Sequence, residues 1–295
     1  WLNYGLGSEN ENLPGFVALS HPRSGKLWRA GFLPSEFQGT RFSADETAPE
    51  KMIRYLKNPR QNQASQRQQL DLLGQLNRLH LKQRGTDAFL EGRIQAMETA
   101  FRMQFTASEA FDVRKEPGAI RDNYGRDTFG NCCLLARRLV ERGVRYVQVF
   151  SGPGQPWDDH HDINKNLRER CPGIDRSCAA LLTDLKQRGL LDETLVIWGG
   201  EFGRTPVSEA GTGRDHNPYG YTMWLAGGGM RGGVAHGATD EFGFRAVENR
   251  VSIHDLHATL LHQMGIDHEK LTYRFSGRDY RLTDVHGRVL HELIA

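Results

Sequence analysis

Two successive segments of the sequence share one order of elements: a helical pattern, a glycine and a short apolar run. The first, NCCLLARRLVERGVRYVQVF, predicts a helix that ends before Gly143 and a strand over residues 144–150. The second, CAALLTDLKQRGLLDETLVIWGG, predicts a helix that ends before Gly189 and a strand over residues 195–198. Helices that alternate with strands in this way favour parallel strands joined by right-handed crossovers. We therefore expect an α/β fold in which both strands end at the same edge of one sheet.

Charged and polar side chains follow each of these strands. In open α/β sheets, ligands bind outside the carboxyl ends of the strands. We therefore expect the two loops, although far apart in sequence, to line one crevice. The loops contain the following candidates: Asp158, Asp159, His160, His161 and Asp162 after the first strand, and Glu201, Arg204, Arg214, Asp215 and His216 after the second.

Carboxylates and imidazoles that converge from strand ends are typical ligands of divalent metal ions. Asp158, His160, Glu201 and His216 are the ligands that we expect, and zinc, calcium and magnesium are the candidate ions. The alternative is that the WDDHH loop is a turn and helix-capping element whose aspartates bind backbone amides. The chain contains no HExxH or CxxC signature that would decide between these interpretations.

In the second loop, Glu201, Arg204 and Arg214 each have more than one possible role. Glu201 follows two glycines, which permit the close approach of a ligand, and this favours a functional side chain. Its alternative role is an ion pair with Arg204 or Arg214. The two arginines provide the bidentate grip that a phosphate or sulfate group requires. They serve equally well as counter-ions for Glu201 and Asp215.

Composition narrows the classes of protein and partner. The chain has 295 residues and a formal net charge of +2, with acidic and basic residues interspersed, so we expect no nucleic-acid partner. No run approaches the roughly 18 apolar residues of a membrane span, so we expect none. Cys171 and Cys178 form a disulfide if the compartment is oxidising, or else the cysteines are buried free thiols. A chain that starts at Trp1 is expected to be a processed product or a fragment.

The remaining expected elements follow from local patterns of apolar, glycine and capping residues. Residues 1–48 predict irregular loops that cover a partner surface. The elements are a strand at residues 16–19, two amphipathic helices within 48–105 broken near Gly85, a solvated helix start at Gln61–Gln69, an edge hairpin at 232–243, a helix at 253–264 with a Ser252 and Asp255 capping box, and a strand pair after residue 271.

Four stretches of the chain are distinctive: WDDHHD at 157–162, LLDETLVIWGGEFGRTP at 190–206, GRDHNPYGYTMWLAGGG at 213–229 and VSIHDLHATLLHQMG at 251–265. Together they resemble a bacterial sulfatase-like family of unknown function within the alkaline phosphatase superfamily. The resemblance covers essentially the whole chain. It implies a three-layer α/β/α sandwich of the alkaline phosphatase and sulfatase type, truncated at its N-terminus, with a helical insertion at residues 48–110.

The sequence departs from the superfamily pattern in two ways. Phe202 stands where the resemblance places a metal-binding histidine. Members of the family also carry a further N-terminal part with a twin-arginine-like export signal, the first metal aspartate and the nucleophile region. The resemblance therefore implies a periplasmic or secreted protein of which this chain is a fragment.

The function that the resemblance implies is hydrolysis of sulfate or phosphate esters, on a small molecule or a polysaccharide. Asp158, His160, Glu201 and His216 are expected to form the metal-binding crevice, and Arg204 or Arg214 is expected to bind the anion. The alternative is a secreted binding or assembly protein without catalysis that holds a sulfated polysaccharide on the same scaffold. Phe202 supports this alternative because it removes a metal ligand.

Overall fold

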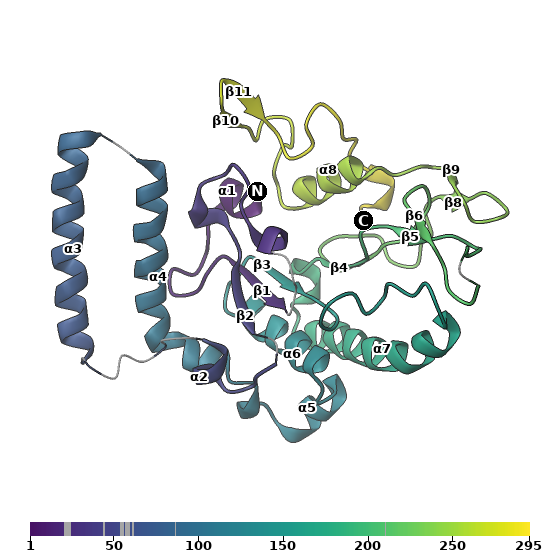
Figure 1. Cartoon of the computed structure of the whole chain (residues 1–295), viewed down its shortest axis with the longest axis horizontal. Helices are drawn as coiled ribbons and strands as arrows, with labels where there is room; N and C mark the ends of the chain where they lie inside the picture. The colour runs from purple at the N-terminus through teal and green to yellow at the C-terminus, as the bar shows by residue number, and fades with distance from the viewer. Residues whose placement is uncertain are drawn as a thin grey trace. The chain divides into compact units, whose positions relative to one another are not determined.

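The protein is a mixed α/β chain in which helices outnumber strands and the sheets are small (Figure 1). The computed structural model describes all residues except 21–24, 44, 54–55, 57–59, 61, 86 and 210. The chain divides into two compact units, Trp1–Gly154 and Gln155–Ala295. Among the described helices, none is both long enough and apolar enough to cross a membrane.

The first unit is built on a parallel sheet of three strands in the order β2-β1-β3. The strands are β1 (Phe16–Ser20), β2 (Thr40–Ser43) and β3 (Tyr146–Val149). Both neighbours run parallel to β1, whose Val17, Ala18 and Leu19 are fully buried. The strand expected at residues 16–19 is therefore confirmed. It lies in the middle of the sheet, so the first 48 residues contribute to the core and are more than a surface covering.

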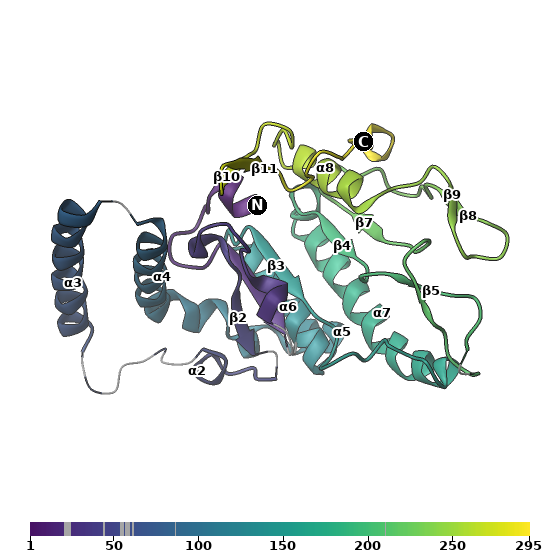
Figure 2. The same cartoon turned by 45° about the horizontal axis from the view of Figure 1, so that its top comes forward.

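Helix α6 (Thr128–Val140) packs against β3 (Figure 2). The Asp127 carboxylate accepts a hydrogen bond from the Gly130 amide and caps its first turn. Gly143 has a φ of 80°, a conformation that glycine adopts without strain, and β3 follows. The first predicted order of helix, glycine and strand is thus confirmed. The shorter helices of this unit are α1 (Leu2–Leu6), η1 (Gly25–Trp28), η2 (Ser35–Phe37), α2 (Pro49–Met52), η3 (Val113–Lys115) and α5 (Gly118–Tyr124).

Two long helices, α3 (Gln63–Arg84) and α4 (Ala88–Ala110), form a pair that is visible in Figures 1 and 2. They confirm the expected pair with its break near Gly85. Arg67 on α3 lies 2.9 Å from the Glu98 carboxylate on α4. The start expected at Gln61–Gln69 lies partly outside the described residues, because Gln61 is among those left out. Four leucines of α3 are at least half exposed: Leu72, Leu73, Leu76 and Leu79.

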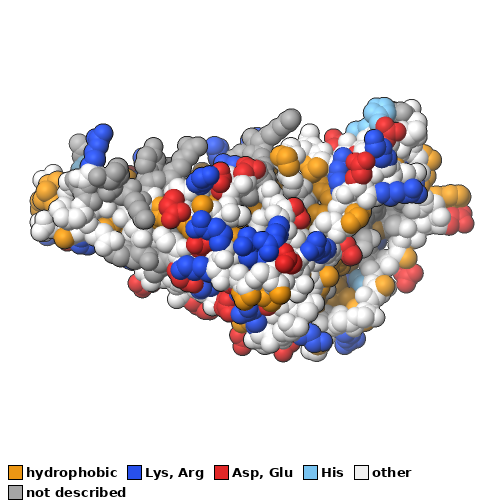
Figure 3. Space-filling model, turned by 90° about the horizontal axis from the view of Figure 1, so that it is seen from below, with side chains coloured by type: hydrophobic (Ala, Val, Ile, Leu, Met, Phe, Trp, Pro, Cys, Tyr) orange, Lys and Arg blue, Asp and Glu red, His pale blue; other side chains and the backbone are white. Residues whose placement is uncertain are grey.

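A buried group of ion pairs fixes α6 against the segment before α5. Arg137 is 1% exposed, and its Nη2 lies 2.8 Å from Oε2 of the nearly buried Glu116. Arg138 bonds the other oxygen of the same carboxylate. Burial raises the pKa of Glu116, but the hydrogen bonds and charges of the two arginines outweigh it and hold the pKa below its usual value. On the face shown in Figure 3, basic and acidic side chains also lie next to one another.

Replacing Glu116 by alanine should destabilise the protein by about 3 kcal/mol or more, because two buried guanidinium groups lose their shared carboxylate. Urea unfolding followed by far-UV circular dichroism measures the change. Asp122→Ala is the matched control, since it removes an exposed ion pair with Arg126 and should barely move the midpoint. A Glu116→Ala protein that unfolds at the wild-type urea concentration would contradict the prediction.

In the second unit, a long helix precedes a set of antiparallel strand pairs. Helix α7 (Ile163–Gln187) contains Pro172. The strand pairs are β4 (Val196–Trp198) with β7 (Trp224–Ala226), β5 (Gly203–Arg204) with β6 (His216–Asn217), β8 (Ala238–Thr239) with β9 (Ala246–Glu248), and β10 (Tyr273–Phe275) with β11 (Arg278–Tyr280). The remaining helices are η4 (Leu191–Glu193), α8 (Ile253–Gln263) and η5 (His291–Leu293). The capping box of Ser252 and Asp255 and the final strand pair are confirmed, and the expected hairpin forms a few residues later than predicted.

The expected parallel pairing of the second strand is wrong. Strand β4 pairs antiparallel with β7, while β3 pairs with β1. The chain reverses its direction between β4 and β7, so the apolar run at 222–226 becomes the antiparallel partner of β4. Helix α7 also begins at Ile163 and not near Cys178.

The four cysteines are free thiols, so the proposed disulfide does not form. Cys171 and Cys178 both lie on α7, where seven residues at 1.5 Å rise separate them by about 10 Å, beyond the Cα separation of a disulfide. The alternative of buried thiols holds for Cys132 and Cys133, whereas Cys171 is exposed. Burial raises the pKa of Cys132 to about 12, which keeps this thiol protonated.

Candidate functional site

The loop at residues 155–162 and the loop at residues 205–217 are joined by hydrogen bonds within the second unit. The Arg214 amide donates to the Asp159 carbonyl at 2.9 Å, and the Ile163 amide donates to the Thr212 carbonyl at 3.2 Å. The contact is so close that a Cβ on Gly213 would lie 1.9 Å from the carbonyl carbon of His160. Only glycine fits this position, and the two loops meet because of it.

Three side chains from these loops converge on one point. Asp158 Oδ1 lies 2.9 Å from His216 Nε2 and 3.2 Å from His160 Nε2. One ligand atom from each residue lies within 4.8 Å of the other two. The Asp158, His160 and His216 side chains are 30%, 39% and 47% exposed, so a small ligand can reach them. We refer to these three residues as the Asp158 cluster.

A fourth residue, Arg204, contacts the Asp158 cluster. Strands β5 and β6 place Arg204 opposite His216. Its Nη2 donates to Asp158 Oδ1 at 2.8 Å and to the Trp157 carbonyl at 3.0 Å. The counter-ion role that the sequence left open is therefore filled, but the partner is Asp158 and neither Glu201 nor Asp215.

The hydrogen bond from His216 and the one from Arg204 lower the pKa of Asp158 to about 2. The carboxyl group therefore stays ionised until the pH falls toward that value. An ionised carboxylate only accepts hydrogen bonds, so His216 Nε2 carries the proton in this arrangement.

A further carboxylate orients His160. Asp215 Oδ1 lies 3.4 Å from His160 Nδ1, and Asp215 Oδ2 accepts a hydrogen bond from the Glu209 amide at 2.9 Å. An acidic partner on one ring nitrogen directs the other nitrogen toward a ligand, as in many metal sites. Asp215 was among the sequence candidates, and the structure places it behind His160.

Phe202 lies against His216. The two rings have centroids 4.2 Å apart and planes 35° from parallel. The Arg204 guanidinium carbon lies 5.8 Å from the centre of the same phenyl ring. Phe202 thus packs beside the cluster and supplies no ligand atom, at the position where the sequence resemblance places a histidine.

Two of the site residues expected from the sequence, Glu201 and Arg214, lie apart from the cluster contacts. Glu201 is exposed and, among the described residues, makes no hydrogen bond or ion pair. It occupies a bend between β4 and β5, so its side chain faces solvent. The Arg214 guanidinium donates from Nη1 to the Thr205 carbonyl at 3.1 Å. Of the four residues expected as ligands, the structure therefore brings together Asp158, His160 and His216.

The other residues of the first loop have structural contacts. Asp159 is 6% exposed and binds Arg170 Nη1 at 2.7 Å and Asn166 Nδ2 at 2.7 Å. His161 is exposed, and Asp162 precedes α7 without a side-chain capping bond. The interpretation of the aspartates as backbone-binding turn residues is therefore not supported for Asp158 or Asp159, whose carboxylates bind side chains. Arg170 and Asn166 were not identified from the sequence, which offers only their helical spacing from Asp159.

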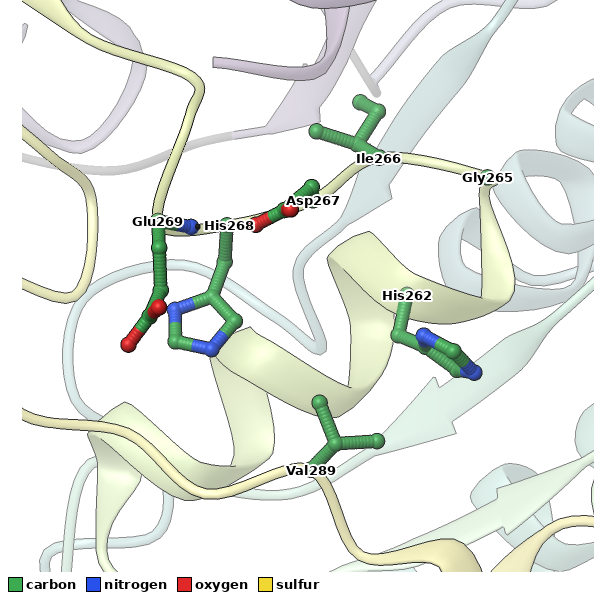
Figure 4. A pocket seen from close by; sticks show the side chains of 7 residues that line it. All are labelled: His262, Gly265, Ile266, Asp267, His268, Glu269 and Val289. Atoms are coloured by element: carbon green, nitrogen blue, oxygen red, sulfur yellow. Dashed lines mark hydrogen bonds between the residues drawn. The ribbon is translucent and has the colours of Figure 1, made fainter.

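A separate pocket lies at the C-terminal end of α8 (Figure 4). Its volume is about 400 Å³, and it shares no residue with the Asp158 cluster. The buried His268 is held there through Nδ1, which lies 3.0 Å from Thr283 Oγ1. The pocket is lined by His262, Gly265, Ile266, Asp267, His268, Glu269 and Val289.

These observations define a mixed α/β protein with a carboxylate and imidazole cluster at the meeting point of two loops. The chain belongs to the family described as protein of unknown function (DUF1501), which matches residues 1–294. No curated protein and no solved structure matches the chain. The family description carries no activity, so the relation to sulfatases stays a prediction.

Substituting Gly213 by alanine should separate the two loops, because the new Cβ would overlap the His160 carbonyl. We expect a loss of about 1–3 kcal/mol in stability and faster hydrogen exchange at the Arg214 and Ile163 amides. Thermal unfolding and amide exchange measure these effects. Gly232→Ala is the control, because no atom lies within 4 Å of its added Cβ. Equal exchange rates in Gly213→Ala and wild type would refute the role of this contact.

Proposed function

We propose that this protein is a metal-dependent hydrolase of sulfate or phosphate esters that works in the periplasm or outside the cell. The observation that supports it best is the convergence of one ligand atom each from Asp158, His160 and His216 within 4.8 Å. The sequence resemblance supports the reaction class, the location and the three-layer α/β/α sandwich of the alkaline phosphatase type.

The donor set fits a divalent transition metal. One carboxylate and two imidazoles suit zinc, whereas calcium and magnesium prefer oxygen ligands alone. The Asp215 carboxylate behind His160 is the outer partner that metal-bound histidines usually have. Three protein ligands leave a position for water or substrate, which is typical of catalytic zinc. We therefore favour zinc over the other two candidate ions.

The roles of the residues follow from their positions. Asp158, His160 and His216 hold the ion, which would polarise the ester oxygen and stabilise the charge that develops there. Asp215 keeps Nε2 of His160 directed into the cluster, and Phe202 restricts the tilt of His216. Arg204 and Arg214 provide guanidinium groups for the anionic part of the ester. Glu201 has a small part in this proposal because it contacts no cluster residue.

Asp158→Ala and His216→Ala should each weaken zinc binding by about tenfold or more, because each removes one of three ligands. Isothermal titration with zinc chloride measures the affinity. Hydrolysis of p-nitrophenyl sulfate and p-nitrophenyl phosphate should fall in the same two variants. His161→Ala is the matched control, since this exposed histidine neighbours His160 in sequence but lies outside the cluster contacts.

Glu201→Ala should retain zinc affinity close to that of the wild type. A large loss in this variant would show that the ligand set is different. Wild-type protein that binds no divalent metal and hydrolyses neither ester would refute the proposed function.

The second candidate function is a secreted binding or assembly protein that holds a sulfated polysaccharide without catalysis. The position of Phe202 against His216 favours it, because a phenyl ring stands where the resemblance implies a second metal ligand. Dextran sulfate should then bind with the same affinity in chelator, in Asp158→Ala and in wild type, while uncharged dextran should not bind. Surface plasmon resonance measures this binding. Loss of dextran sulfate binding on chelation would exclude this candidate.

A further inference from the structure

Asp158 Oδ1 contacts several groups, and it cannot retain all of these contacts when it also binds a metal ion. Three nitrogen atoms lie within 3.2 Å of this one oxygen: Arg204 Nη2 at 2.8 Å, His216 Nε2 at 2.9 Å and His160 Nε2 at 3.2 Å. A carboxylate oxygen has two lone pairs, and the hydrogen bonds from Arg204 and His216 already occupy both. A metal ion ligated by Asp158 needs one of those lone pairs.

Arg204 holds its place through several contacts. Besides Asp158, the guanidinium donates to the Trp157 carbonyl at 3.0 Å and to the Arg214 carbonyl at 3.3 Å. The Arg204 side chain is only 22% exposed, so its charge is partly shielded from water. A fixed positive charge at this distance repels a divalent cation at the same carboxylate.

We propose that Arg204 is a built-in competitor for the metal ion at Asp158, so that metal binding and the ion pair between Arg204 and Asp158 exclude each other. The proposal rests on the metal site of the proposed function and adds a coupling to it. In the absence of an ion, Arg204 neutralises Asp158 and keeps the two loops together. When an ion takes Asp158 Oδ1, the guanidinium loses its carboxylate partner and becomes available to an anionic ligand.

This competition affects how tightly an ion binds. Each ion has to displace the same ion pair, so the affinity of every ion falls by the same factor. Calcium and magnesium bind imidazole poorly, whereas zinc binds it well. An ion that gains little from the two imidazoles therefore fails to displace Arg204 at concentrations at which zinc does.

Isothermal titration of zinc chloride into wild type and Arg204→Ala tests the competition directly. Arg204→Ala should bind zinc at least about tenfold more tightly than wild type, which corresponds to about 1.4 kcal/mol. Arg204→Lys keeps the charge and should stay closer to wild type than Arg204→Ala does. Adding guanidinium chloride at millimolar concentration should weaken zinc binding in Arg204→Ala more than in wild type, because the free ion can occupy the vacated position.

Arg274→Ala is the charge-matched control, because it removes one arginine whose exposed partner is Asp279 on the β10–β11 hairpin. Its zinc affinity should equal that of wild type. Thermal unfolding reports whether each variant is folded. If Arg204→Ala does not fold, the same comparison is made with Arg204→Gln, which keeps a polar side chain without the charge.

Four outcomes are distinguishable. Tighter zinc binding without the Arg204 guanidinium supports the competition. Zinc binding by the variant alone also supports it, but contradicts metal-dependent catalysis by the wild type. Unchanged or weaker zinc binding in a folded variant overturns the competition and leaves the proposed function standing. Absence of binding in both proteins overturns the competition and the metal site together.

Discussion

The candidate site depends on the close approach of two loop backbones at Gly213 and His160. No side chain other than hydrogen fits between them, since a Cβ would lie 1.9 Å from a carbonyl carbon. The backbone hydrogen bonds on either side of this point then align the loops, so that Asp158 and His216 meet although 58 residues separate them. The histidine and carboxylate chemistry follows from a steric condition in the main chain. A substitution at Gly213, which has no side chain of its own, is therefore expected to disturb the positions of Asp158 and His216.

The charges around Asp158 follow from that approach. One ionised oxygen faces a guanidinium and two imidazoles, and each of these groups is held by something else: Arg204 by backbone carbonyls, His160 by Asp215 and His216 by the Phe202 ring. Arg204 is the permanently charged group that contacts Asp158 Oδ1. The proposed metal ion would use the same oxygen and the two imidazoles. This one carboxylate thereby connects the proposed activity with the proposed role of Arg204.

The sequence predicted the site better than it predicted the sheet around it. The order of helix, glycine and strand placed the loops of Asp158 and His216 after two successive strands of one sheet. The structure puts these strands, β3 and β4, in separate sheets, and the contact between the two loops brings the side chains together. The pairing partner of β4 was not predictable, because an apolar run such as 222–226 fits a parallel or an antiparallel neighbour equally well. Glu201 was expected in the site from its position after a strand, but the bend that turns its side chain to solvent depends on the path of the following hairpin.

The contribution of β1 to the core likewise depends on long-range pairing and not on local pattern.

Pro172 gives α7 a mechanical discontinuity next to the site. Proline has no amide hydrogen, so the carbonyl four residues earlier in the helix lacks its usual backbone partner. The turns before Pro172 carry Asn166 and Arg170, which hold Asp159 and with it the first loop. The turns after Pro172 continue toward β4. One missing backbone hydrogen bond therefore separates the turns that hold the first loop from the turns that lead to β4.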